Sequence, residues 1–299
     1  MRDKDACTLA HGVGSPKIPA MKIAILGGGR MGEALVRGMI ASGITTGDRI
    51  ALSASTPERA RQSAAALGVT ASESNAAAVK GAEVVFLCVK PAKALEVVAS
   101  AAPELAGKLL VSIVAGIPSG DILRAAGGAC RIIRSMPNTA VRLRKGVTAI
   151  APDDTATPDD MGLAFRLFSS VGTAVEVRES DLDTVTAVSG SGPAFALLML
   201  ESLAQGGVEG GLDPGLSRIL ATGALASAAA LVAETGETPL ALRAEITSPG
   251  GTTAEGLAVL EESHFTQAVR GAVRAARRRS SELSGRAAGG TGGGIATGT

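Results

Sequence analysis

A glycine-rich turn between a strand and a helix is the feature that most limits how this chain can fold. Residues 27–32 read GGGRMG, which matches the pattern G-x-G-x-x-G. An aliphatic run at 22–26 precedes the turn, and helical periodicity follows it. In this setting Gly27 permits the tight turn, and Gly29 lets the backbone approach a pyrophosphate, which the free N–H groups of the helix start would bind. The turn therefore predicts a dinucleotide-binding α/β domain.

After the turn, short aliphatic runs alternate with helical stretches. Strands are expected near 22–26, 49–53, 84–89, 109–114, 131–134 and 146–151. A series of strand, helix and strand implies a parallel sheet covered by helices on both faces. A last helix at 158–171 and a strand at 173–177 complete this domain.

From about Glu179 the pattern changes to helices alone. Helices are expected at 193–207, 214–235, 239–246, 252–262 and 266–283. We therefore predict a Rossmann-type doubly wound domain over 21–178 and an all-α dimerisation domain over 179–284, with the boundary inside a helix. Residues 1–20 and 285–299 are predicted to be a disordered extension and a disordered tail.

The end of the second predicted strand indicates which dinucleotide binds. An acidic residue there would bind the ribose hydroxyls of NAD, but the sequence reads LSASTP and has no carboxylate before Glu58. Hydroxyls and cations occur there instead, on Ser53, Ser55, Thr56, Arg59 and Arg61. These groups suit a 2′-phosphate, so NADPH is the predicted cofactor and NADH the alternative. Thr56 can also cap the following helix, and the two roles are compatible.

Composition excludes several chemistries. Lys and Arg number 29 against 28 Asp and Glu, so bulk charge attracts neither nucleic acid nor anionic lipid. Two His and three scattered Cys assemble neither a metal site nor a Ser-His-Asp triad.

The longest apolar run, Ile219–Ala233, is shorter than the ~20 residues of a membrane helix. Cys88 and Cys130 are expected to be buried, and unpaired cysteines fit a cytoplasmic protein.

Five further motifs follow the glycine-rich turn. They are VKP at 89–91, SIVAG at 112–116, MPNT at 136–139, SGSGPA at 189–194 and SPGGTT at 248–253. In this order they closely resemble pyrroline-5-carboxylate reductase, the last enzyme of proline biosynthesis, over roughly residues 21–283. The sequence departs from that pattern at Phe195, where the family often has Tyr, and in the cationic loop 142–145.

The resemblance implies a reductase that passes a hydride from NAD(P)H to the C=N bond of 1-pyrroline-5-carboxylate and yields L-proline. With the second-strand hydroxyls, the predicted cofactor-binding residues are Gly27, Gly29, Arg30, Met31, Gly32, Ser53, Ser55, Asn75, Val89, Lys90, Pro91, Ala115, Gly116 and Asn138. Among these, Lys90-Pro91 and Ala115-Gly116 would line the nicotinamide end. A structural role for Lys90 and a turn-forming role for Asn138 are the alternatives.

The motif at 248–253 gives a separate reason to expect a small carboxylate substrate. Its glycines leave backbone N–H groups uncovered at a helix start, which attracts a carboxylate without Arg or Lys. A glycine-rich turn with a Ser or Thr cap is the alternative interpretation. The predicted substrate-binding residues are Ser248, Gly250, Gly251, Thr252 and Thr253. Thr253 is the candidate catalytic residue, because its hydroxyl can reach the ring nitrogen and no Tyr or Lys follows Lys145.

The helices expected at 193–207 and 214–235 carry apolar residues on more than one face. A lone helical layer cannot hide that surface, so we expect at least a homodimer, and the resemblance adds larger rings of dimers. The alternatives are a reductase of another cyclic imine carboxylate, a silent NADPH-binding protein, and a hydroxyacid-type reductase, a class known for a lysine in its helical domain. The lack of a lysine after Lys145 argues strongly against the last.

Overall fold

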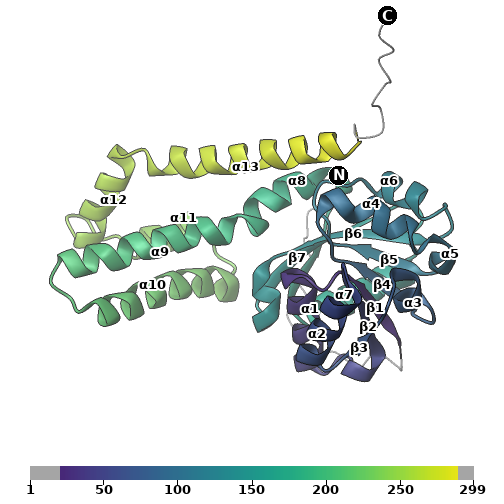
Figure 1. Cartoon of the computed structure of the whole chain (residues 1–299). Coiled ribbons are helices and arrows are strands. Elements are labelled where there is room, and N and C mark those ends of the chain that lie inside the picture. Colours follow the sequence, from purple (N-terminus) through teal and green to yellow (C-terminus); the bar gives the residue numbers. More distant parts are fainter. Residues whose placement is uncertain (1–20, 289–299) are drawn as a thin grey trace, which may run out of the picture. The chain divides into compact units, whose positions relative to one another are not determined.

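An eight-stranded sheet forms the N-terminal part of the chain in the computed structural model, which describes residues 21–288 (Figure 1). The strands are β1 (Ile23–Leu26), β2 (Ile50–Ser53), β3 (Thr70–Ala71), β4 (Val84–Leu87), β5 (Leu109–Ser112), β6 (Arg131–Pro137), β7 (Gly146–Pro152) and β8 (Gly172–Glu176). Their spatial order is β3-β2-β1-β4-β5-β6-β7-β8. The strand order therefore reverses between β1 and β4, which is where a doubly wound sheet binds its ligand.

One pair of strands departs from the all-parallel sheet expected from the sequence. β7 runs antiparallel to β6, whereas the other neighbouring pairs are parallel. The connection between them holds only the short helix η2 (Thr139–Leu143). A parallel return needs a crossover of a dozen or more residues, so the short connection turns the strand back. The two-residue strand β3 was also not expected.

Helices cover both faces of this sheet (Figure 1). They are α1 (Arg30–Ser42), η1 (Gly47–Arg49), α2 (Pro57–Leu67), α3 (Asn75–Val79), α4 (Pro91–Ala99), α5 (Ala102–Leu105), α6 (Ser119–Ala125) and α7 (Pro158–Ser169). Ile23 and Ile25 share a core with α1, α2 and α7, and Ala24 and Leu26 share another with α3 to α6. Because successive strand side chains point to opposite faces, the whole apolar run of β1 is buried.

The core is largely aliphatic, because the chain has no Trp or Tyr and only five Phe. Its aromatic contact is an edge-to-face pair of Phe86 on β4 and Phe168 on α7, with ring centroids 5.9 Å apart. Cys88 and Cys130 are both buried and unpaired, which confirms that expectation. Burial raises the pKa of the Cys88 thiol, so this group stays neutral.

The C-terminal part is helical, as expected. Its elements are η3 (Glu179–Asp181), α8 (Leu182–Val185), the π-helical turn η4 (Thr186–Gly190), α9 (Gly192–Glu209), α10 (Pro214–Thr235), α11 (Pro239–Glu245), α12 (Thr252–Glu262) and α13 (Phe265–Ala288). Helix α13 continues past residue 285, so the predicted tail starts too early. The rest of that tail and the predicted extension at 1–20 lie outside the described residues.

Packing divides the chain into two compact units. The first unit comprises the chain up to Gly190 and the chain from Arg277 onward. The second unit is Ser191–Ala276. The end of α13 belongs to the first unit because Asp183 on α8 accepts hydrogen bonds of 2.6 and 2.7 Å from Ser280 and Ser281. The boundary at residue 178 stays a prediction.

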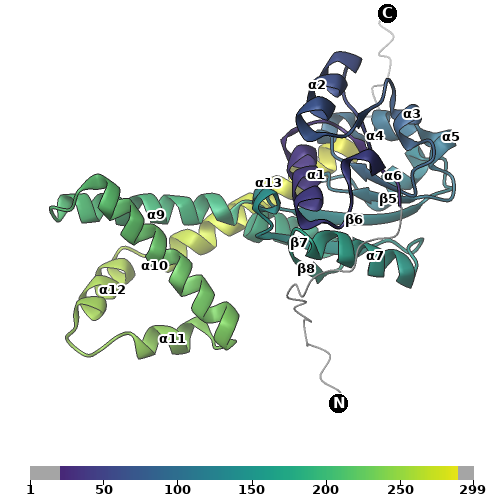
Figure 2. The same ribbon diagram turned by 90° about the horizontal axis from the view of Figure 1, so that it is seen from below.

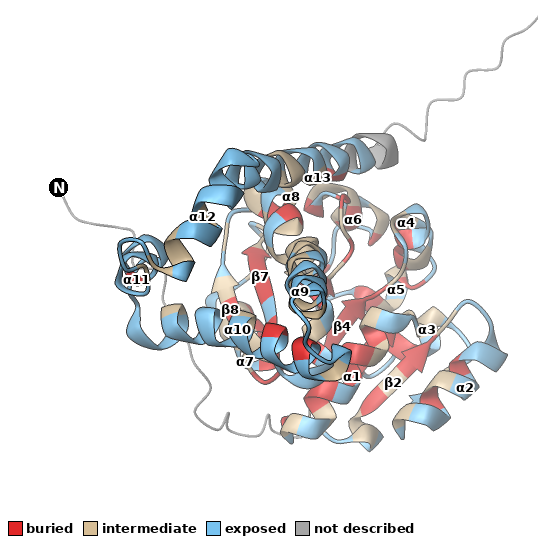
Figure 3. Cartoon of the chain, turned by 90° about the vertical axis from the view of Figure 1, so that its left-hand side faces the viewer, coloured by how far each residue is buried: buried red, intermediate tan, exposed pale blue. Residues whose placement is uncertain are grey.

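In the second unit, α9 and α10 pack against each other, and Figure 2 shows that they cross at an angle. Ser217 on α10 donates a 2.6 Å hydrogen bond to the carbonyl oxygen of Ala204 on α9, and Gly207 leaves room for that hydroxyl. Beyond this seam most residues of both helices are exposed (Figure 3).

The apolar helices are longer than the run seen in the sequence. The helical segment Glu179–Glu209 and helix α10 are long and apolar enough to cross a membrane, by length and composition alone. In the most apolar 18-residue stretch of each, only 6% and 11% of the stretch is buried within this chain. Helix α10 therefore has the range expected from the sequence, 214–235, but few residues of its apolar run at Ile219–Ala233 are buried within this chain.

Candidate active site

The turn after β1 has the conformation that the glycine pattern predicts. Gly27 has φ +115°, and a Cβ built there would lie 2.5 Å from the carbonyl oxygen of Cys88. Its N–H donates a 3.0 Å hydrogen bond to the carbonyl oxygen of Ser53. A side chain at Gly27 would be strained and would clash with backbone, so only glycine fits.

The first turn of α1 presents free donors. Its N-cap is Gly29, and no side chain caps the helix. A Cβ on Gly29 would meet no atom within 4 Å, whereas one on Gly32 would lie 2.5 Å from the carbonyl oxygen of Gly27. No side chain caps the N-terminal amide groups, which begin at the exposed Arg30 and the half-buried Met31, and a glycine at the N-cap leaves room beside them. This is the geometry that binds a pyrophosphate.

The end of β2 differs in part from the sequence-based expectation. Ser53 is buried, and its hydroxyl donates a 2.7 Å hydrogen bond to Oδ1 of Asn75 at the start of α3. Asn75 in turn donates a 2.9 Å bond from Nδ2 to Ser100. The Ser53 hydroxyl thus positions Asn75 and does not point freely toward a ligand.

The exposed hydroxyls and cations expected here follow β2 directly. Thr56 caps α2 by accepting a 3.3 Å hydrogen bond from the N–H of Arg59, as the alternative interpretation predicted. Arg61 is paired with Glu58 at 2.8 Å. Arg59 and Ser55 are exposed, and within residues 21–288 no carboxylate pairs with Arg59. Arg59 is therefore the guanidinium available to a phosphate.

On the other side of β1, the ends of β4 and β5 supply the remaining predicted contacts. Val89 is half-buried, and the exposed Lys90 is the N-cap of α4, which starts at Pro91. The turn at Ala115-Gly116 follows β5, and its neighbours Val114 and Ile117 are buried in the core. Parallel strands end at the same edge of the sheet, so these residues share the edge of the glycine-rich turn.

Asn138 fits the turn-forming alternative better than the cofactor role. It is 8% exposed, and Nδ2 donates to the carbonyl oxygen of Ser189 at 3.2 Å. Its Oδ1 accepts from the N–H groups of Ala140 and Val147 at 3.2 and 3.4 Å. Both ends of the amide are occupied, so contact with a cofactor stays a prediction.

The sequence did not reveal two pairs of residues, one beside the glycine-rich turn and one beside the turn that follows β5. Ser63 on α2 donates hydrogen bonds to the carbonyl oxygen of Gly28 and to Glu33 on α1, at 3.4 and 3.1 Å. Arg134 on β6 is paired with Glu179 at 2.9 Å. Glu33 could have been found from its place directly after the glycine motif. No local pattern marks Ser63, Arg134 or Glu179.

The predicted substrate turn lies in the second unit. Gly250 has φ +69°, which favours glycine, and the N–H of Gly251 donates a 3.0 Å hydrogen bond to the carbonyl oxygen of Ser248. Gly251 is the N-cap of α12, and no side chain caps this helix. The alternative interpretation, in which a Ser or Thr side chain caps this helix, is therefore wrong. Thr252 is exposed and Thr253 half-buried in a first turn with free amide groups.

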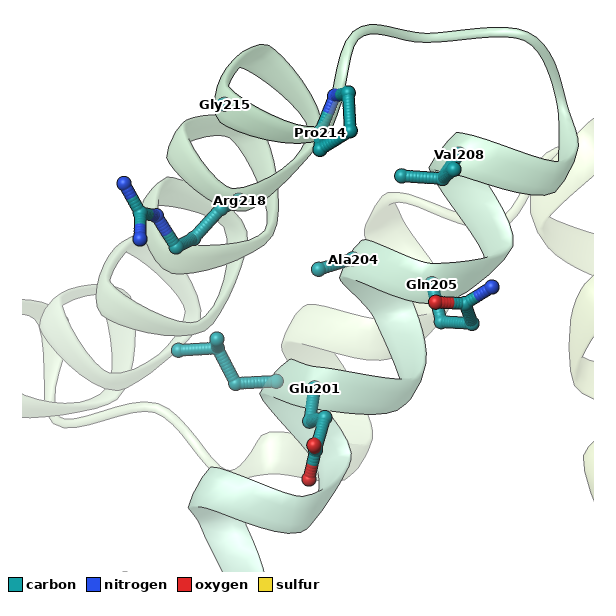
Figure 4. A pocket seen from close by; sticks show the side chains of 8 residues that line it. Glu201, Ala204, Gln205, Val208, Pro214, Gly215 and Arg218 are labelled. Carbon is teal, nitrogen blue, oxygen red and sulfur yellow. The ribbon is translucent and has the colours of Figure 1, made fainter.

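A separate hollow of about 450 Å³ lies between α9 and α10. Figure 4 shows its wall, which is mostly aliphatic, with Glu201 on α9 and Arg218 on α10 among the polar side chains. No ion pair joins these two residues. Within the part of the chain that the structure describes, no three His, Cys, Asp or Glu gather as metal ligands.

A doubly wound sheet with an open, uncapped phosphate turn, followed by apolar helices, defines a dinucleotide-dependent oxidoreductase. Comparison with known families agrees. Residues 179–283 match a model described as pyrroline-5-carboxylate reductase dimerisation, and residues 22–116 match one described as NADP oxidoreductase, coenzyme F420-dependent. The chain belongs to the pyrroline-5-carboxylate reductase family.

Individual relatives support this assignment along most of the chain. The pyrroline-5-carboxylate reductase of Methanosarcina acetivorans is 39% identical over 84% of this chain and 94% of its own length. That of Synechocystis is 40% identical over 86% and 96%. The crystal structure of the Plasmodium falciparum enzyme, with NADP bound, superposes with a TM-score of 0.81 at 30% identity and covers 88% of this chain and 98% of its own.

Proposed function

We propose that this chain reduces 1-pyrroline-5-carboxylate to L-proline with NADPH, by hydride transfer to the imine carbon. The observation that carries the proposal is the pair of uncapped helix starts, α1 and α12, in a chain of this family. The first suits the pyrophosphate of a dinucleotide and the second suits the carboxylate of a small substrate.

The residues around β1 and β2 fit a phosphorylated dinucleotide. The amide groups of Arg30, Met31 and Gly32 would hold the pyrophosphate, and Arg59 would hold the 2′-phosphate. Asn75, held by Ser53, would contact the adjacent ribose. When bound, NADPH supplies the hydride. The NADP complex of the Plasmodium relative supports this choice of cofactor.

The turn at 248–253 would hold the substrate. The free amide groups of Thr252 and Thr253 at the start of α12 would bind the carboxylate without a cationic side chain. The hydroxyl of Thr253 would donate a hydrogen bond to the ring nitrogen, which must carry a proton as the imine carbon receives the hydride. Ser248, Gly250 and Gly251 shape this turn.

A second copy of the chain is the partner that we propose for the exposed apolar helices. Leu197 and Leu198 on α9, and Ile219 and Leu220 on α10, are each more than half exposed. Such a patch marks an interface, and the family model that covers these helices is one for dimerisation. The hollow between α9 and α10 is lined by residues of the same two helices, and we assign it to the proposed interface. Rings of dimers, a cytoplasmic location, and the absence of a membrane or nucleic-acid partner stay predictions.

The direct test is NADPH oxidation, followed by its absorbance, when pyrroline-5-carboxylate is added to the purified chain. The matched comparison is a six-membered cyclic imine carboxylate at the same concentration. We expect kcat/KM to be at least about tenfold higher for the five-membered ring, because extra bulk displaces the imine carbon from the hydride. A higher kcat/KM for the larger ring would identify the alternative, a reductase of another cyclic imine.

A further inference from the structure

The carboxylate of Glu179 joins three segments of the first unit. It accepts hydrogen bonds from the N–H and the hydroxyl of Ser119, at 2.8 and 2.7 Å, and from Nη1 of Arg134 at 2.9 Å. Ser119 begins α6, Arg134 lies on β6, and Glu179 begins the helical segment after β8. One side chain therefore ties two neighbouring chain segments of the sheet region to the start of the helices.

The segment held by Ser119 is the turn that leaves β5. Residues 113–118 connect Ser112, the last residue of β5, to Ser119. Val114 and Ile117 anchor this turn in the core below, while Gly116 adopts φ +78° at its tip. Glu179 fixes the end of the turn from the other side, because both donors of Ser119 point at its carboxylate.

The strand order places this turn beside the reactive half of a bound dinucleotide. The pyrophosphate lies at the glycine-rich turn after β1, and the adenosine half lies toward β2. The other half must extend over β4 and β5, on the opposite side of the point where the strand order reverses. The turn at 113–118 follows β5 at that edge.

Arg134 depends on Glu179 for its charge partner. The Arg134 side chain is 10% exposed, and its Nε is buried with no hydrogen-bond partner among the described residues. Arg134 lines a hollow of about 250 Å³ together with Gly116, Pro118 and two acidic residues. These acidic residues are Glu179 and Asp183. Asp183 is occupied by Ser280 and Ser281. Loss of the Glu179 charge would leave a buried guanidinium without its counter-ion.

We propose that Glu179 and Arg134 are positioning residues that hold the turn at 113–118 against the nicotinamide half of the cofactor. The inference rests on the proposed function, because it takes the ligand to be a nicotinamide dinucleotide. Neither residue needs to touch the reacting atoms. Their effect is to keep Ala115 and Gly116 at a fixed height above the sheet edge, so that the ring lies in one orientation.

The test compares two ligands that differ in the nicotinamide half. In the proposed binding mode NADPH would reach the turn at 113–118, whereas 2′,5′-ADP, which lacks the nicotinamide half, would end before it. For Glu179→Gln we expect the Kd of NADPH to rise about fivefold or more and the Kd of 2′,5′-ADP to stay within about twofold. Arg134→Lys, which keeps the charge, should restore part of the lost affinity relative to Arg134→Gln. Equal weakening of both ligands, or no change in either, overturns the proposal.

A matched control comes from the same strand. Asp160→Asn breaks the 2.7 Å ion pair with Arg131 on β6 and leaves the turn at 113–118 untouched. It should lower Tm without changing the ratio of the two Kd values. If Glu179→Gln does not fold, Ser119→Ala removes one of the three bonds and should shift the ratio in the same direction by a smaller factor; an unchanged ratio there overturns the proposal.

Binding and turnover separate this inference from the proposed function. A chain that binds NADPH but does not reduce pyrroline-5-carboxylate contradicts the proposed substrate, and the ratio of the two Kd values still tests the role of Glu179. A wild-type chain that binds neither ligand contradicts both. In an active enzyme, Glu179→Gln should also lower kcat roughly tenfold at saturating NADPH, because the ring is no longer held in one orientation.

Discussion

The hydroxyl of Ser53 donates a 2.7 Å hydrogen bond to Oδ1 of Asn75, across 22 residues of sequence. The carbonyl oxygen of Ser53 also accepts a hydrogen bond from the N–H of Gly27. One residue at the end of β2 therefore contacts both the phosphate turn and the start of α3. Two predicted cofactor residues thus act as a pair, in which one positions the other.

The pair predicts unequal effects for two neighbouring serines. Ser53→Ala should lower the free energy of unfolding by about 1 kcal/mol, because a buried hydrogen bond is lost, and should weaken NADPH binding through Asn75. Ser55→Ala is the control, since Ser55 is exposed and should change stability by less than about 0.5 kcal/mol. Urea unfolding of both variants measures this, and equal stabilities would contradict the pairing.

Arg59 should decide the choice between NADPH and NADH. Arg59→Ala is expected to raise the KM for NADPH roughly tenfold and to leave the KM for NADH unchanged, because only the former carries a 2′-phosphate. Arg61→Ala serves as the control, as Arg61 already pairs with Glu58. Initial rates with both cofactors give the ratio. A wild-type enzyme that prefers NADH would refute this assignment.

Thr253 is expected to act at the ring nitrogen. Thr253→Ala should lower kcat roughly tenfold or more, within the range for loss of a positioned proton donor, while Thr253→Ser keeps most activity. Thr252→Ala is the neighbouring control, because it keeps the backbone amide and changes only an exposed side chain. Normal turnover of Thr253→Ala with unchanged KM would reduce Thr253 to a helix-start residue.

Assembly should depend on the apolar face of α9. We expect light scattering without detergent to give at least twice the chain mass of 29.6 kDa at micromolar concentration. Leu198→Glu should shift the protein toward the monomer, because a charge would be buried at the interface. Leu143→Glu is a matched control on η2, since the two leucines are 64% and 66% exposed in the single chain. A monomeric wild type would rule out the proposed interface.

The ion pair of Asp160 and Arg131 predicts a dependence of stability on acid pH. Burial acts to raise the pKa of Asp160, but hydrogen bonds from Arg131 and Thr157 outweigh it and hold this pKa below the ordinary value of 3.8. The folded state therefore binds this proton less well than the unfolded state. Its contribution is present above the ordinary pKa and is lost as pH falls through the folded pKa.

Thermal unfolding at two pH values tests this contribution. Asp160→Asn should lower Tm clearly at pH 7 and by less near pH 3, whereas the exposed Asp154→Asn should have little effect at either. A Tm difference between wild type and Asp160→Asn that is the same at both pH values would contradict the prediction.

Much of the architecture could be predicted because its signals are local. The spacing of Gly27, Gly29 and Gly32 after an aliphatic strand specifies a turn that approaches phosphate. The strands of the first unit other than β3, the helix α7 and the helices α9 to α12 occur close to the expected residues, because hydrophobic period and proline position act within one element. The reversal at β7 was missed, since it depends on how the connection after Asn138 closes and not on the pattern of the strand.

The sequence by itself determined the fold class, the phosphate turn at Gly27–Gly32 and the glycine-rich turn before α12, because each depends on residues that are neighbours in the chain. Only the tertiary structure decided which side chains meet across the chain. Glu179 finds Ser119 at a separation of 60 residues and Arg134 at 45, and Ser53 finds Asn75. In the sequence Glu179 is one of 28 acidic residues, with no periodic pattern to distinguish it. Its partners follow from the order of β5, β6 and β8 in the sheet, a long-range arrangement that no local spacing encodes.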